Sequence, residues 1–210
     1  MKGACVYMLD DDPALCEAVT GLLRSVDLSV KAFFDVETFL AFERPEVPSC
    51  LILDVRLKGA SGLDFQARMD SLRLKLPVIV MTAYGDIPMS VKAMKAGALG
   101  FLTKPFRDQD LIDAVMEALQ QDQQRREREQ GVMALLARHD NLSEREQQVM
   151  ALATEGLLNK QIAGELGISE VTVKIHRGSV MRKMNAGSFA ELVRMAHALA
   201  NCPMLNRRQG

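Results

Sequence analysis

The chain has 210 residues, of which 48% are hydrophobic and 25% are charged, and this balance excludes a largely disordered protein. No stretch approaches the ~20 apolar residues of a membrane span, and an acidic run close to the N-terminus disfavours a signal peptide. The cysteines Cys5, Cys16, Cys50 and Cys202 form no CxxC pair, which disfavours disulfides and cysteine metal sites. We therefore expect a cytoplasmic protein with reduced thiols and no membrane partner.

The charge is unevenly distributed between the two halves of the chain. Residues 1–120 carry 13 lysines and arginines against 17 acids, whereas residues 121–210 carry 13 against 10. An acidic half followed by a basic half suggests different partners for each, with a polyanion favoured for the second.

A polar segment separates these halves. Residues 120–130, QQDQQRREREQ, contain no apolar side chain and cannot contribute to a core, so a domain boundary is expected through or beside them. The segment is rich in helix formers and predicts a solvated helical extension. The run 132–138 could then pack on either domain or on another subunit. The expected divisions are a first domain at 1–121, a helical linker at 122–140, a second domain at 141–202 and a tail at 203–210.

Short apolar runs alternate with helical patterns in the first domain. The runs span residues 4–9, 29–34, 50–54, 77–82 and 100–103. Asp35, Ser61 and Asp108 are predicted helix N-caps, and Ser61 with Asp64 resembles a capping box. Five strands that alternate with helices predict an α/β domain with a doubly wound, five-stranded parallel sheet. Sites in such sheets form at the carboxyl ends of the strands.

Those strand ends carry polar groups suited to phosphoryl chemistry. The first run ends in Asp10-Asp11-Asp12, the third in Asp54 and the fourth in Thr82, and the fifth runs into Lys104-Pro105. Clustered carboxylates repel one another, so Mg²⁺ is the natural counter-ion. Asp54 can act as an aspartyl nucleophile, while Thr82 and Lys104 can contact a phosphoryl group. Each residue alone is most simply a turn or cap residue, and their joint order is what points to a site.

Residues 1–120 resemble the receiver domain of two-component response regulators. The resemblance rests on LDDDP (9–13), LILDVR (51–56), VMTAYGD (80–86) and KAMKAGALGFLTKPF (92–106). It implies a flavodoxin-like or CheY-like fold in which Asp54 is the phosphoacceptor and a sensor histidine kinase is the donor. It also assigns Asp10, Asp11, Asp54 and the backbone carbonyl of Arg56 to Mg²⁺.

The same resemblance gives roles to residues around the phosphoacceptor. Thr82 and Lys104 would contact the phosphoryl group, Thr82 and Phe101 would form the switch, and the Lys104–Pro105 bond is expected to be cis. Phe101 can equally be a core residue. Asp12 matches a common third acid without a direct metal role. Lys58 departs from the proline usual at its position, which should loosen the loop and adds a cation that could attract phosphate.

The second domain has the pattern of a helix-turn-helix. Ser143 and Glu146 form a predicted capping box, a helix follows Asn159-Lys160, Gly167 breaks the chain, and Ser169 can cap the next helix. Residues 171–183 contain four cations and no acid. We therefore expect an all-α domain of four helices.

The helix after Ser169 has two distinct faces. At 100° per residue, Val173, Val180 and Met184 point inward, while the opposite side carries Lys174, Ile175, Gly178 and Arg182. An exposed isoleucine among cations suits contact with a thymine methyl group, although a stray surface residue or a protein contact would also explain it. Gly178 costs about 1 kcal/mol within a helix.

Residues 142–184 and 188–196 resemble the LuxR-type helix-turn-helix of FixJ/NarL response regulators. The resemblance places Lys174 and Ile175 near base edges and Lys160 and Arg182 near phosphates, while Gly178 departs from the polar or basic residue usual there. The expected DNA-binding set is Lys160, Thr172, Lys174, Ile175, Arg177, Gly178 and Arg182.

Together the two halves predict a phosphorylation-controlled transcription regulator, by resemblance an activator rather than a repressor. It would bind promoter DNA, dimerise on phosphorylation and contact RNA polymerase, with no enzymatic activity beyond self-catalysed phosphoryl transfer and dephosphorylation. One alternative is an aspartyl-phosphate hydrolase, which Pro13 and the separate Asp54 fit poorly. Another is an adaptor whose helices bind protein or RNA, which salt-dependent, sequence-specific DNA binding would exclude.

Overall fold

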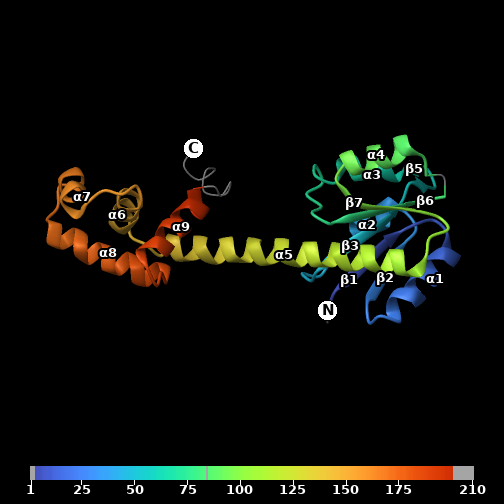
Figure 1. The fold of residues 1–210 in the computed structure, drawn as a ribbon, viewed down its shortest axis with the longest axis horizontal. Coiled ribbons are helices and arrows are strands. Elements are labelled where there is room, and N and C mark those ends of the chain that lie inside the picture. Colours follow the sequence, from blue (N-terminus) through green and yellow to red (C-terminus); the bar gives the residue numbers. More distant parts are fainter. Residues whose placement is uncertain (1–2, 84, 201–210) are drawn as a thin grey trace. The chain divides into compact units, whose positions relative to one another are not determined.

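The computed structural model describes residues 3–83 and 85–200. The chain divides into two compact units, Met1–Arg126 and Glu127–Gly210 (Figure 1). Within the described part of the chain, no helix is both long and apolar enough to cross a bilayer. Cys202 and residues 203–210 lie outside the described residues.

The first unit is built on a five-stranded parallel sheet, as predicted. Its strand order is β2-β1-β3-β6-β7. The strands are β1 (Cys5–Leu9), β2 (Ser29–Phe33), β3 (Ser49–Asp54), β6 (Val78–Thr82) and β7 (Ala98–Thr103). β3 and β6 are buried along their whole length, which explains why their sequences are continuous apolar runs rather than alternating ones.

Helices cover both faces of this sheet. They are α1 (Pro13–Arg24), α2 (Val36–Ala41), α3 (Gly62–Arg68), α4 (Ile87–Lys95) and the start of α5 (Asp108–Asp140). α1 and α5 share one core cluster, which includes Leu23 and Leu119, whereas α2, α3 and α4 share the other, which includes Phe39 and Phe65. Two separate cores therefore hold the sheet between two helical layers.

Helix caps define where the loops leave the sheet. The carboxylate of Asp35 accepts the Thr38 N–H at 2.7 Å, and the Ser61 hydroxyl accepts the Asp64 N–H at 3.3 Å, which confirms both predicted N-caps. Asp108 differs from the prediction because α5 begins at this residue itself. Its carboxylate therefore lies in the first turn, where a negative charge still complements the helix dipole.

A small hairpin that the sequence analysis did not anticipate follows Asp54. Strands β4 (Arg56–Leu57) and β5 (Ala60–Ser61) pair antiparallel across a turn at Lys58 and Gly59, where Gly59 has φ +76°. Gly62 then returns against the sheet, since a Cβ there would lie 1.9 Å from the carbonyl oxygen of Asp54. Backbone pairing, rather than a proline ring, thus holds the chain beside Asp54.

The polar segment 120–130 lies within α5, and part of it packs on the sheet. Asp122 is fully buried and accepts the Ser49 N–H at 2.9 Å. Arg125 and Arg126 donate to the same carboxylate, Arg126 at 2.6 Å. The first unit therefore extends to Arg126, inside the segment 120–130, and the expectation that this segment is a solvated extension is wrong at Asp122. Three hydrogen-bond donors compensate this carboxylate for the loss of water on burial.

The second unit is helical. It contains α6 (Glu144–Thr154), α7 (Asn159–Leu166), α8 (Glu170–Met184) and α9 (Phe189–Ala200). Gly167 adopts the left-handed conformation, with φ +64°, at the turn between α7 and α8, and Ser169 caps α8 as predicted. Leu135 and Leu136 of α5 pack in this unit, which settles where the run 132–138 belongs.

One buried carboxylate joins α6 to α8. The predicted capping box is present, with Glu146 accepting the Ser143 N–H at 2.7 Å. The same carboxylate accepts hydrogen bonds from the Ser179 hydroxyl at 2.5 Å and from the Lys183 ammonium at 2.6 Å. Donation from Lys183, then Ser179 and the Ser143 backbone, lowers the pKa of Glu146 from its ordinary value of 4.5 to about 2.

The stability of the helical unit is therefore expected to depend on pH. Because the folded-state pKa of Glu146 is lowered, its contribution is complete above about pH 4.5 and is lost as the pH falls towards 2. Glu146→Gln should destabilise this unit by roughly 1–3 kcal/mol at neutral pH and flatten the acid dependence. The free energy can be measured by urea titration followed through the NMR signals of Val180 and Met184.

Glu144→Gln is the matched control, since Glu144 is an exposed acid in the same helical turn. A loss of stability equal to that of Glu146→Gln would contradict the assignment.

Candidate functional site

The parallel register brings the predicted polar residues to one edge of the sheet. Leu9 pairs with Leu53, which places Asp10, just beyond β1, next to Asp54, the last residue of β3. On the other side Asp54 pairs with Met81, one residue before Thr82. Thr82 pairs with Thr103, and its carbonyl accepts the Lys104 N–H at 2.7 Å. Four strand ends thus assemble a single polar site from distant parts of the sequence.

A lysine bridges two carboxylates in this site. The Nζ of Lys104 lies 2.7 Å from Oδ2 of Asp10 and 3.2 Å from Oδ2 of Asp54. Burial, and then the nearby charge of Asp10, raises the pKa of Asp54, while Lys104 opposes the increase. Burial alone would lower the pKa of Lys104, but its bonds with Asp10 and Asp54 leave that pKa raised. The carboxylates of Asp10 and Asp54 therefore place two negative charges beside the Lys104 ammonium group. The Lys104–Pro105 bond is cis, as predicted.

Three of the acids are arranged to hold a cation. Asp10, Asp11 and Asp54 each offer a carboxylate oxygen, and these oxygens lie within 4.8 Å of one another. An all-oxygen donor set fits Mg²⁺, which takes one or two carboxylates and completes its shell with other oxygens. Arg56 begins β4 beside this group, with its N–H 3.4 Å from Oδ1 of Asp54.

Two charged residues next to this group, Asp12 and Lys58, lie outside the set of three acids. The Asp12 carboxylate accepts the N–H groups of Ala14 and Leu15, so this acid is the N-cap of α1. Lys58 is 83% exposed, and its Nζ lies 3.9 Å from Oδ2 of Asp11. Such an exposed pair contributes little to stability, but it places a cation at the entrance of the acidic site.

Thr82 and Phe101 occupy adjacent strands. Thr82 is buried at the end of β6, and Phe101 of β7 is half-buried against the core that α2, α3 and α4 share. A Cβ at Gly85 would lie 2.3 Å from Cγ2 of Thr103 and 3.2 Å from the Phe101 ring. Gly85, in the loop after Thr82, therefore lies directly against the Phe101 ring.

Sequence reasoning missed Gly62 and Gly85, whose backbones lie close to residues of this site, and it also missed the buried Gln66. Gln66 is buried, and its side-chain amide donates to the carbonyls of Ala93 and Ala96 at 3.1 and 3.2 Å, which joins α3 to the end of α4. A glycine shortly after Asp54 and another shortly after Thr82 were the available signals. Nothing in the local pattern distinguished Gln66 from a surface glutamine.

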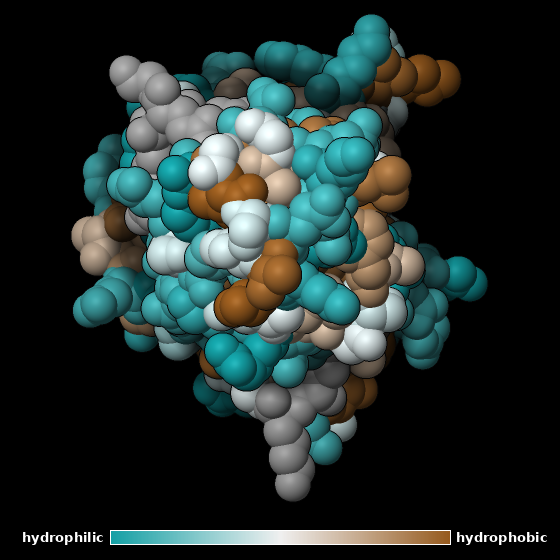
Figure 2. All heavy atoms as spheres, turned by 90° about the vertical axis from the view of Figure 1, so that its left-hand side faces the viewer, coloured by the Kyte–Doolittle hydropathy of each residue, from teal (hydrophilic) through white to brown (hydrophobic). Residues whose placement is uncertain are grey.

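The outer face of α8 presents most of the predicted DNA-binding residues. Lys174, Ile175, Gly178 and Arg182 are exposed, with Ile175 at 65%, while Val173, Val180 and Met184 are buried as predicted. Lys160 is exposed on α7, and the Thr172 hydroxyl bonds to that of Ser169 at 2.8 Å. Figure 2 shows that the face of the molecule turned to the viewer there is mainly hydrophilic, with separate hydrophobic groups.

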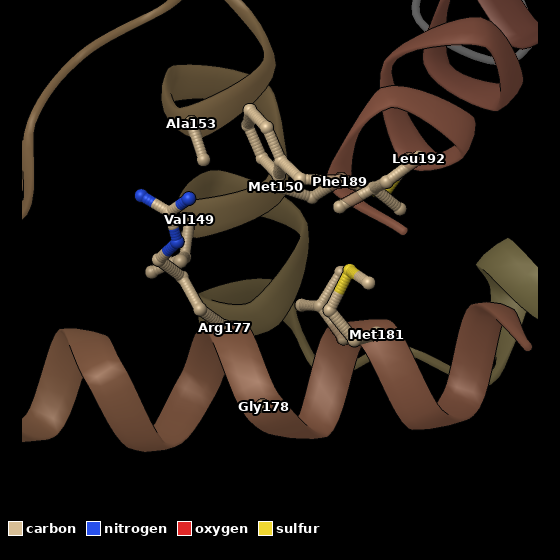
Figure 3. Close-up of a pocket in the computed structure, with 9 residues that line it drawn as sticks. Val149, Met150, Ala153, Arg177, Gly178, Met181, Phe189 and Leu192 are labelled. Atoms are coloured by element: carbon tan, nitrogen blue, oxygen red, sulfur yellow. The ribbon is translucent and has the colours of Figure 1, made fainter. Parts of the chain in front are cut away.

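Arg177 lies apart from this outer face. Its Nη1 donates to Oδ1 of Asn159 at 2.9 Å, and its guanidinium group lies 4.7 Å from the centre of the Phe189 ring. Figure 3 shows the side chain rising from α8 towards α6, beside an apolar pocket of about 180 Å³ that Val149 and Leu192 help to line. Arg177 thus joins helices within the unit. Around the axis of α8, Arg177 points in nearly the same direction as the inward-facing Val173, and this position was the sequence signal for its role.

Gly178 has no packing reason to be glycine. A Cβ at this position would meet nothing within 4 Å, so the unit itself would accept alanine there.

The chain is similar to known proteins along nearly its whole length. Residues 6–116 match the family of response regulator receiver domains, and residues 140–196 match the bacterial regulatory proteins of the luxR family. Nodulation protein W of Bradyrhizobium diazoefficiens is 50% identical over 93% of this chain and 86% of its own length. The response regulator protein TodT of Pseudomonas putida is 46% identical over 94% and 87%.

Solved structures give the same result. The response regulator StyR superposes with a TM-score of 0.83 at 45% identity, covering 92% of this chain and 98% of its own. Full-length FixJ from B. japonicum superposes with a TM-score of 0.57 at 37% identity, covering 96% and 100%. With both family matches in this order and relatives of this identity, the chain belongs to the two-component response regulators that join a receiver domain to a luxR-type DNA-binding domain and regulate transcription.

Proposed function

We propose that this regulator is switched on when a sensor histidine kinase phosphorylates Asp54, and that it then activates transcription as a homodimer bound to promoter DNA. The observation that carries the proposal is the Lys104 ammonium between the carboxylates of Asp10 and Asp54. Such a cation neutralises a buried nucleophilic carboxylate and remains to contact an incoming phosphoryl group. Contact between the DNA-bound dimer and RNA polymerase is part of the same proposal.

The transfer step uses residues that already lie together. An oxygen of Asp54 attacks phosphorus, the P–N bond to the donor histidine breaks, and the imidazole leaves with the electron pair and takes a proton. Lys104 and Thr82 then contact the oxygens of the transferred group. Asp10, Asp11 and Asp54, with the backbone carbonyl of Arg56, would hold Mg²⁺, which when bound neutralises charge on the phosphoryl oxygens.

Thr82 is the residue through which we propose that phosphorylation is sensed. Its hydroxyl would turn towards the phosphoryl group, and the loop against Phe101 would follow. Nearby, α4 exposes three large apolar side chains, with Ile87 at 80% and Met94 at 50%. This helix and β7 are therefore the proposed dimer surface.

DNA contact is proposed for Lys160, Thr172, Lys174, Ile175, Gly178 and Arg182. Ile175 would meet a base edge, and Arg182, further along the same face of α8, would meet a phosphate. Arg177 is omitted because its guanidinium group points towards Asn159 and Phe189 within the helical unit, and not outward from α8.

The phosphoacceptor assignment is tested by substitution. Asp54→Asn should abolish stable labelling by acetyl phosphate, because an amide cannot form the acyl phosphate. Asp11→Ala should lose the Mg²⁺ dependence of labelling. Asp12→Asn is the control, since asparagine also caps a helix, and should label normally. Undiminished labelling of Asp54→Asn at one native-like site would refute the assignment.

Dimerisation is tested by sedimentation velocity before and after phosphorylation. At micromolar concentration the wild-type chain should shift from monomer to dimer. Val91→Asp places a charge on α4 and should prevent the shift without reducing Asp54 labelling. Val26→Asp changes a similarly exposed valine at the end of α1, on the other face of the sheet, and should dimerise normally. No change in mass for the phosphorylated wild type would count against the mechanism.

The two kinds of DNA contact predict different binding defects. Ile175→Ala should cost about 1–3 kcal/mol at the preferred site and relax preference at one or two base pairs. Arg182→Ala should weaken all duplexes alike and reduce the salt slope by roughly one unit. Both are measured at fixed salt on matched and scrambled duplexes. If Ile175→Ala changes neither affinity nor preference, α8 does not lie in the groove in this way.

A further inference from the structure

A second polar pocket lies at the opposite edge of the receiver sheet from Asp54. It has a volume of about 310 Å³ and lies where β3 begins. The loop after α2, the loop before β6 and the last α5 residues of the first unit contribute to its lining. We call it the basal pocket. Its cationic lining residues are Arg44, Arg73, Lys75, Arg125 and Arg126. Glu46 is the only acid among the described residues that line it.

Three of the guanidinium groups are held in place by the fold. Nη1 of Arg44 donates to the carbonyl of Phe39 at 2.9 Å, and its guanidinium group lies 5.1 Å from the centre of the Phe39 ring. Arg125 and Arg126 both donate to the buried carboxylate of Asp122. Held guanidinium groups lose less conformational entropy on binding than free surface cations, which is a property of a built site.

The inner wall adds a hydroxyl group that has no partner. Tyr7 lines the pocket, and its buried hydroxyl makes no hydrogen bond within the described part of the chain. Burial raises the pKa of Tyr7, which keeps the phenol protonated and able to donate. A buried donor without an acceptor is unfavourable, and a bound oxyanion would satisfy it.

We propose that the basal pocket binds a small, multiply charged oxyanion, either an organic phosphate or a polycarboxylate. Several guanidinium groups around one hydroxyl suit oxygens that accept hydrogen bonds in pairs, and the volume suits a small molecule rather than a folded partner. Leu74 and Leu76 offer an apolar surface to its carbon atoms. The ligand would contact both the sheet and the last receiver residues of α5, and it would not touch the phosphoacceptor site.

Isothermal titration of the full chain with pyrophosphate and with citrate tests this proposal. The buffer contains no Mg²⁺ and has fixed ionic strength, and sulfate serves as the reference anion. We expect one saturable site per chain for at least one of the two probes. Tighter binding of pyrophosphate would identify a phosphate ligand, and tighter binding of citrate a polycarboxylate.

The double variant Arg73→Gln/Lys75→Gln changes exposed loop residues and should weaken binding at least tenfold. Arg24→Gln/Arg194→Gln removes the same charge from exposed positions on α1 and α9 and should change the affinity less than twofold. Tyr7→Phe deletes only the hydroxyl and should weaken binding several-fold, with the fold checked by circular dichroism. Acetyl phosphate labelling of Asp54 should persist in all these variants, so failure here is distinct from failure of the phosphoacceptor proposal.

Absence of saturable binding for both probes would overturn the proposal. Equal weakening by the loop double variant and by Arg24→Gln/Arg194→Gln would also overturn it, since that would indicate general charge attraction. If neither the loop variant nor Tyr7→Phe changes the affinity, the anion binds elsewhere and the proposal is wrong.

Discussion

The bridge from Lys104 to Asp10 and Asp54 is the interaction on which the first unit depends. Two carboxylates this close and this buried would repel each other strongly, and one ammonium group makes their proximity tolerable. The bridge needs the parallel register, because it joins residues 50 and 94 positions apart in the sequence. The sheet, the two helical layers and the hairpin after Asp54 serve to fix that geometry.

The helical unit uses a comparable device for a different purpose. Glu146 is also a buried carboxylate with several donors, but all of them are local to α6 or on α8. The Lys104 cluster retains an excess of acid, which suits a site that receives a cation and a phosphoryl group. The Glu146 cluster is satisfied by its own donors, which suits a joint that holds the outer face of α8 in position.

Much of this arrangement was predictable because it depends on local patterns. Continuous apolar runs indicated the strands, and Asp35, Ser61, Ser143 and Ser169 indicated where helices begin. The acidic site was predictable because parallel strands place their carboxyl ends at one edge. Features that depend on long-range contacts were not predictable. The burial of Asp122 depends on Ser49, and the inward position of Arg177 depends on Asn159 and Phe189, so composition alone suggested a solvated linker and a DNA-facing cation.

The burial of Asp122 also determines how the receiver can be separated from the rest of the chain. A fragment that stopped at residue 121 would keep every strand and every apolar core residue of the first unit, yet it would leave the Ser49 N–H at the start of β3 without its acceptor. A hydrogen bond to a charged group contributes about 1.5–3 kcal/mol, a sizeable share of the stability of a small domain. The smallest autonomous receiver therefore includes the turn of α5 through Arg126, a stretch with no apolar side chain.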